Sequence, residues 1–152
     1  MKTLSNADDK REILKRIESI RPGSSRRWGK MTAHQMICHL SDGYRMMMSE
    51  KPVVPVGVWY PRAVLRFAAL WTPFPWPRGF ASAPEVDQHS HGTPPAQFEA
   101  DVQDLRELVE RFARQPRDFE PQAHPHFGRL SQRALMRLGY LHAHHHLQQF
   151  GA

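Results

Sequence analysis

Apolar residues recur every three or four positions in separate stretches of the chain, a spacing typical of amphipathic helices. The first stretch covers residues 8–20, where charged side chains occupy the face opposite the apolar one. The second begins with Thr32 as a plausible N-cap and continues through residue 49. The apolar positions of these two predicted helices are Ile13, Leu14, Ile17 and Ile20, then Met36, Leu40, Tyr44 and Met47.

Two more helices are predicted in the second half of the chain. Thr93 and Pro94 are typical of an N-cap followed by proline at the first helical position, which predicts a helix reaching about residue 114. Ser131 can cap a last helix that continues nearly to the C-terminus. No segment alternates apolar and polar residues long enough to predict a sheet. The pattern therefore predicts an all-α four-helix bundle, with residues 1–152 forming one domain.

The segment 52–95 interrupts this regular pattern between the second and third predicted helices. It holds nine of the thirteen prolines, together with Trp59, Trp71 and Trp76. Residues 62–71 predict a short apolar helix, and the prolines after it force an extended path. So much aromatic surface suggests packing over the bundle, a pocket wall or a homodimer contact, and the sequence leaves all three open.

Composition narrows the functional classes. No apolar run approaches the roughly 20 residues of a membrane span, and the N-terminus has no signal-peptide core, so we expect a cytoplasmic protein without a membrane partner. The net charge is +6, but the basic residues are scattered among acids and no nucleic-acid-binding motif is present. We therefore do not expect a nucleic-acid partner. Cys38 is the sole cysteine, which excludes an internal disulfide and a multi-thiolate zinc site.

Ten histidines give the chain its candidate chemistry. His142 and His146 are four residues apart on the last predicted helix, so their Cβ atoms should lie about 5–6 Å apart on one face. Such a pair needs a third ligand from elsewhere, and His39 is the best candidate because it lies mid-helix at the edge of an apolar stripe. Three imidazoles would suit Zn, Ni, Fe or Mn. Spacing alone leaves an alternative open, in which these are core histidines satisfied by hydrogen bonds.

Other polar residues receive smaller roles. His124 and His126, in the loop before the last helix, could line a pocket mouth or act as a general base. Gln149, one turn after His146, could orient a ligand through its amide. The remaining candidates are expected to be solvated or structural: His34, His89 and His91 as solvated histidines, Asp42 and Glu50 as surface charges, and Cys38 as a packing residue.

Several short motifs carry a family resemblance when taken in order. They are Trp28-Gly29-Lys30-Met31-Thr32, Gln35-Met36, His39-Leu40, His124-Pro125-His126-Phe127-Gly128, and Tyr140 with His142, His145-His146-Leu147 and Gln149-Phe150. Together they resemble a bacterial branch of unknown function in the DinB/YfiT-like superfamily. That resemblance implies a four-helix bundle holding a divalent metal through one histidine on the second helix and a pair on the last, positions matched by His39, His142 and His146.

The resemblance also suggests a class of activity. Some relatives are transferases or isomerases that use low-molecular-weight thiols such as bacillithiol or mycothiol. We therefore expect a metal-dependent, thiol-dependent transferase acting on an unidentified small molecule. The alternative is a non-catalytic, dimeric binding protein of the same fold, because a fold does not by itself transmit a reaction.

Overall fold

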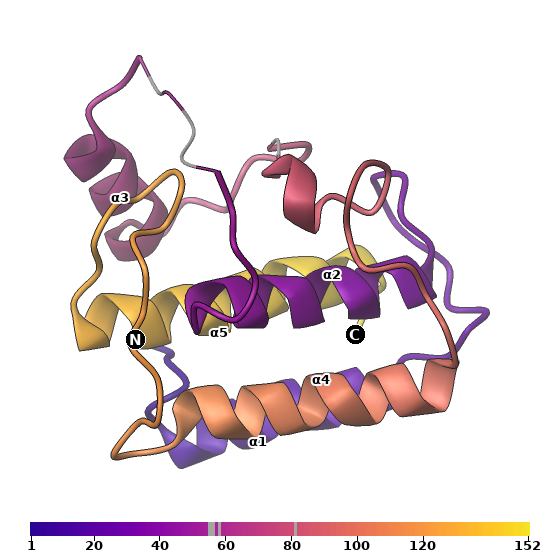
Figure 1. The fold of residues 1–152 in the computed structure, drawn as a ribbon. Coiled ribbons are helices and arrows are strands. Elements are labelled where there is room, and N and C mark those ends of the chain that lie inside the picture. The colour runs from indigo at the N-terminus through magenta and orange to yellow at the C-terminus, as the bar shows by residue number, and fades with distance from the viewer. Residues whose placement is uncertain (55–56, 58, 81) are drawn as a thin grey trace.

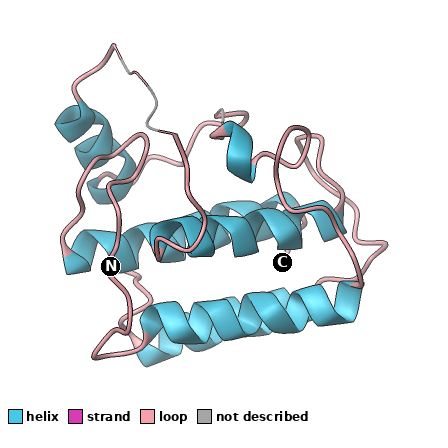
Figure 2. Ribbon diagram, in the orientation of Figure 1, coloured by secondary structure: helices cyan, strands magenta, loops and turns pink. Residues whose placement is uncertain are grey.

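The computed structural model describes residues 1–54, 57, 59–80 and 82–152. Its helices are α1 (Ala7–Ser19), α2 (Ala33–Met47), α3 (Arg62–Trp71), α4 (Phe98–Ala113) and α5 (Gln132–Gln149), with a short 3₁₀ helix η1 (Pro84–Val86). The described residues form helices and loops with no strand, apart from one isolated bridge between His124 and Gly128 (Figure 2). The all-helical prediction is confirmed.

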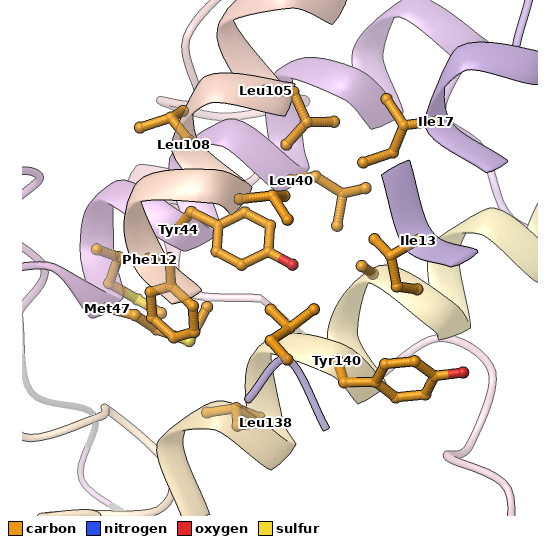
Figure 3. Packing of buried hydrophobic residues seen from close by; sticks show 14 of the residues in the cluster. Ile13, Ile17, Leu40, Tyr44, Met47, Leu105, Leu108, Phe112, Leu138 and Tyr140 are labelled. Atoms are coloured by element: carbon orange, nitrogen blue, oxygen red, sulfur yellow. The ribbon is translucent and has the colours of Figure 1, made fainter. Parts of the chain in front are cut away.

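The four long helices form two layers, with α1 beside α4 and α2 beside α5 (Figure 1). Each helix of one layer packs on the other layer as well, because α2 contacts α4 and α1 contacts α5. Apolar side chains from all four helices meet between the layers, including Ile17, Leu40, Leu105 and Leu138 (Figure 3). The predicted apolar stripes are therefore the surfaces that build the core.

Close helix contacts tie α5 to its neighbours. The buried Tyr44 hydroxyl on α2 donates to the carbonyl of Gly139 on α5 at 2.9 Å. A Cβ atom at Gly139 would lie only 2.5 Å from the ring of Phe112 on α4, so glycine is needed for this approach. These contacts fix the position of α5, the helix that carries the paired histidines.

Side-chain caps explain where three of the helices begin. Asn6 accepts from the backbone N–H groups of α1, and Ser131 accepts from Ala134 N–H at the start of α5. Thr32 and Gln35 form a reciprocal capping box at the start of α2. The predicted caps Thr32 and Ser131 are confirmed, and the end of α2 falls two residues before the predicted residue 49.

The predicted start of the third long helix is wrong. α4 begins at Phe98, and the N–H and hydroxyl groups of Thr93 donate to the carboxylate of Asp42 instead. A cap at Thr93 would also need N–H groups two or three residues later, but Pro95 has none and Ala96 N–H donates to Asp101. The two prolines therefore belong to an extended approach to the helix.

The segment 52–95 between α2 and α4, called the excursion from here on, lies over the side of the α2/α5 layer that faces away from α1 and α4 (Figure 1). The predicted helix 62–71 is confirmed as α3, which packs on α5, whereas η1 packs on α2. The carbonyl of Leu70, a fully buried residue, accepts from the Arg137 side chain. Four positions of the predicted excursion, 55, 56, 58 and 81, lie outside the described residues. Among the described helices, none is long and apolar enough to cross a membrane.

Candidate metal centre

His39, His142 and His146 converge between α2 and α5. Each offers one ring nitrogen, and these three nitrogens lie within 4.8 Å of one another. Nε2 of His39 is 3.2 Å from Nε2 of His142, and the ring centroid of His146 is 4.6 Å from that of His39. Two nitrogens bound tetrahedrally to zinc at 2.0–2.1 Å are separated by about 3.3 Å, so the spacing of the His39 and His142 nitrogens already fits an ion.

Backbone and side-chain oxygens orient two of the rings. His39 Nδ1 lies 2.7 Å from the carbonyl of Val86 in η1, and a carbonyl only accepts, so Nδ1 carries the proton. His146 Nδ1 lies 3.1 Å from Oε1 of Gln149, whose own amide nitrogen donates to the carbonyl of Trp28 at 2.8 Å. In both neutral rings the lone pair is therefore on Nε2, the orientation that a metal ligand needs.

Gly43 makes room for the third ring. It lies one turn after His39 on α2, and a Cβ atom there would be 2.6 Å from Cε1 and 3.0 Å from Nδ1 of His142. Such distances are too short for a real side chain, so any larger residue would push the ring of His142 aside. The sequence could have shown this only as a glycine inside a helix, which has a cost in stability and so suggests a packing role.

All three rings are held neutral. Burial lowers the pKa of His39, and burial together with the neighbouring imidazoles lowers the pKa of His142 and of His146 well below 6.5. Neutral imidazole is the form that binds metal ions, because its second nitrogen keeps a lone pair. The cluster is therefore prepared for a cation without any proton having to leave at neutral pH.

The cluster opens into a pocket of about 610 Å³. Its walls come from α2, α5, the segment before α2, the loop before α5 and the excursion, and they are mainly apolar. Trp76 contributes to the wall and lies with its ring centroid 6.5 Å from that of His142, while its indole N–H donates to Ala69. Of the three possible roles for the aromatic excursion, the pocket wall is thus observed, and so is packing over the bundle.

His124 and His126 line the same pocket, as the sequence suggested. Nδ1 of His124 accepts the backbone N–H groups of His126 and Phe127, so the proton of its neutral ring is on Nε2. Burial lowers the pKa of His124 to about 3. Nδ1 of His126 lies 3.0 Å from the Tyr60 hydroxyl. These contacts make His124 a fixed hydrogen-bond donor, and a catalytic role for either histidine stays a prediction.

Several smaller expectations need correction. Asp42 is not a surface charge: it is fully buried, pairs with Lys51 at 2.9 Å and binds Thr93. His34 is not merely solvated, because its Nε2 lies 2.6 Å from a carboxylate oxygen of Asp101 on α4. Thr93 and Asp101 are 51 and 67 residues away from Asp42 and His34 in sequence, so no local pattern reveals these contacts.

Cys38 behaves as the sequence indicated. It is buried, and burial together with the Asp101 carboxylate raises the pKa of its thiol to about 12. A thiol with so high a pKa is a poor nucleophile at neutral pH. It nevertheless belongs to a second group with metal-ligand character, because the ligand atoms of His34, Cys38 and Asp101 all lie within 4.8 Å of one another.

Comparison with known proteins places the chain in a family. A family model described as a protein of unknown function, DUF1569, matches residues 3–152. The chain belongs to the DUF1569 family. Searches of curated proteins and of solved structures found no match. Membership in DUF1569 carries no activity with it, so the function of this DUF1569 chain has to be argued from its pocket.

Proposed function

We propose that this DUF1569 protein binds a divalent metal ion through His39, His142 and His146 and uses it in a thiol-dependent transfer reaction. The observation that carries the proposal is the convergence of three neutral rings, in which His39 and His146 have their Nε2 lone pairs fixed by Nδ1 contacts and Nε2 of His142 lies 3.2 Å from that of His39. The same three positions match the metal ligands implied by the resemblance to the DinB/YfiT-like superfamily. Zn, Ni, Fe and Mn all suit three imidazoles.

The pocket supports catalysis more than storage of the ion. A three-histidine set would leave coordination positions open on a bound ion, and the three histidines line a cavity large enough for a small organic molecule. When bound, such an ion supplies Lewis acidity and lowers the pKa of a thiol or water. The apolar walls exclude water and hold the non-reacting part of a substrate. Nε2–H of His124 is available to donate a hydrogen bond, and Lys30 at the rim can attract an anionic group.

Metal analysis tests the ligand assignment. Protein purified without a nickel column should contain an ion that is lost in His39→Ala and in His142→Ala. His144→Ala is the matched control, because His144 is on the same helix but lies against Tyr140 and Arg16. We expect the control to keep the ion. Equal metal content in all four proteins would contradict the assignment.

A spectroscopic titration tests the open coordination position. Cobalt-substituted protein should change its visible absorption when bacillithiol, mycothiol or a simpler thiol is added, because a thiolate entering the coordination sphere alters the ligand field. His142→Ala, which lacks one ligand, should not show the change. A cobalt spectrum that no thiol perturbs would contradict thiol-dependent chemistry while leaving metal binding intact.

One observation favours the alternative of a dimeric binding protein. The excursion exposes large apolar side chains, with Trp59 95% exposed, Phe74 76% and Phe67 64%. Apolar surface of this kind is typical of an interaction site. A homodimer that forms through α3 and closes over the pocket should be weakened by Phe67→Ser in analytical ultracentrifugation. A monomer at all concentrations would contradict this alternative.

A further inference from the structure

A second cluster of ligand-type side chains lies on another side of α2. His34 and Cys38 are four residues apart on this helix, and Asp101 faces them from the first turns of α4. One carboxylate oxygen of Asp101 is 2.6 Å from His34 Nε2 and 3.7 Å from Cys38 Sγ. We propose that His34, Cys38 and Asp101 form a second divalent-cation site, suited to zinc, that joins α2 to α4.

The distances are close to those of a bound ion. With zinc bonds of about 2.3 Å to sulfur and 2.0–2.2 Å to oxygen, a tetrahedral site separates these two ligands by roughly 3.6 Å. The observed separation between Sγ and the carboxylate oxygen is 3.7 Å. The nitrogen and oxygen are closer than an ion requires, because they share a hydrogen. Opening that contact by roughly 0.7 Å is a small side-chain rotation for His34 and Asp101, which are 22% and 25% exposed.

The donor set favours zinc over the hard cations. A thiolate, an imidazole and a carboxylate combine soft and intermediate ligands, whereas magnesium and calcium prefer oxygen alone. On binding, Cys38 loses its thiol proton to solvent, and the His34 ring places its proton on Nδ1 so that Nε2 can coordinate. A water molecule can complete four-coordination from the solvent side, which the partial exposure of His34 and Asp101 leaves accessible.

The distribution of charged side chains on this side of α2 also supports a cation site at Asp101. Two neighbouring carboxylates already have cationic partners, Asp42 with Lys51 and Asp104 with Arg45. Among the described residues, the Asp101 carboxylate contacts the ring of His34 and accepts from Ala96 N–H, and no lysine or arginine pairs with it. A divalent ion would supply the missing positive charge between a carboxylate and a buried sulfur.

Cobalt binding provides a direct test, because the chain has one cysteine. A thiolate bound to Co²⁺ gives a charge-transfer band in the near ultraviolet, and three imidazoles do not. The wild-type protein, stripped of metal and titrated with Co²⁺, should develop this band and bind two ions per chain. Cys38→Ser should lose the band and one ion, and His34→Ala should weaken the band-forming site at least 10-fold.

Two controls separate this site from the pocket. His142→Ala should lose the pocket ion and keep the thiolate band, which shows that the sites are independent. Asp101→Asn should weaken the band-forming site, whereas Asp104→Asn, one turn further along α4, should leave it unchanged. Absence of the band in wild type, its persistence in Cys38→Ser, or its loss in folded His142→Ala would each overturn the proposal. In the first case the cluster is a hydrogen-bonded helix contact only.

Discussion

Two stripes of α2 carry different chemistry although they are adjacent in sequence. His34, Cys38 and Asp42 follow one another at four-residue intervals and face α4 and the segment before it. His39 and Gly43, each one residue after Cys38 and Asp42, face α5 and the pocket. Each residue of a helix is turned by about 100° from the one before, so a shift of one position is enough to change the environment completely.

The two stripes differ in how burial is compensated. On the flank stripe, defined by His34, Cys38 and Asp42, each carboxylate involved is balanced by a cation or hydrogen-bond donor. On the pocket stripe, defined by His39 and Gly43, burial instead keeps His39 neutral, as it does His142 on the facing helix α5. A neutral, desolvated imidazole with a lone pair can bind a cation, whereas a charge that is already paired contributes to the stability of the fold. We therefore expect changes at the ion pairs of the flank stripe to act mainly on folding stability, and changes on the pocket stripe to act mainly on binding of the pocket ion.

The largest effect expected on the flank stripe is that of Asp42→Ala. The change leaves Lys51 and the Thr93 N–H and hydroxyl groups without their buried partner. We expect a loss of about 3 kcal/mol in the free energy of unfolding, measured by urea denaturation. Asp104→Ala is the matched control, since it removes a more exposed ion pair with Arg45 and should cost less than about 1 kcal/mol. Equal losses would remove the distinction between buried and exposed carboxylates.

Gly43→Ala tests the pocket stripe. The new Cβ atom would collide with the ring of His142 and turn its Nε2 away from His39. We expect metal affinity to fall by up to about 100-fold, measured by competition with a chromophoric chelator, with a far smaller effect on unfolding of the metal-free protein. Gly23→Ala is the control, because nothing lies within 4 Å of its added Cβ. Unchanged affinity in Gly43→Ala would mean that the ring tolerates displacement.

Periodicity was enough to predict the helices because their apolar stripes are also the core surfaces. It was also enough to predict that His142 and His146 lie on one face, because residues four apart on a helix are neighbours on its surface. It could select His39 only as a candidate, because its distance from α5 depends on how the bundle closes. The resemblance to the DinB/YfiT-like superfamily, and not the spacing, indicated that His39 joins His142 and His146 in one site.

The remaining features depend on contacts between distant segments. The carbonyl of Val86 contacts His39 only because η1 packs on α2. Every residue has a backbone carbonyl, so the sequence cannot indicate which one accepts this hydrogen bond. Asp42 and Thr93 are 51 residues apart, so neither the buried carboxylate nor the false helix start at Thr93 could be seen locally. The Val86 contact orients His39 in the metal cluster, and the Thr93 contact makes Asp42 a structural residue.

Acidification offers a test of His124, which lines the pocket from the loop before α5. His124 has its pKa lowered to about 3 by burial, so the folded protein holds it neutral while the unfolded chain protonates it near pH 6.5. Stability from this group is present above pH 6.5 and is lost as the pH falls towards 3. Between pH 7 and pH 5, metal-free wild type should lose about 2 kcal/mol more than His124→Asn, whose amide oxygen can still accept the backbone N–H groups. Parallel pH profiles from chemical denaturation would contradict this assignment.

The smallest effect is expected at the orienting amide of the metal centre. Gln149→Leu removes the acceptor of His146 Nδ1 and the donor to the Trp28 carbonyl, while all three ligand rings remain. Because the ring of His146 then loses its preferred tautomer and orientation, metal affinity should fall by about 10-fold, measured with the same chelator. Gln148→Leu is the matched control: it changes the neighbouring, exposed amide and should leave affinity unchanged. The thiolate band of the flank site should be the same in both variants, since Gln149 acts only on the pocket stripe and its partners. A loss of affinity shared by both variants would instead indicate a general disturbance at the end of α5, and the orienting role of Gln149 would be lost.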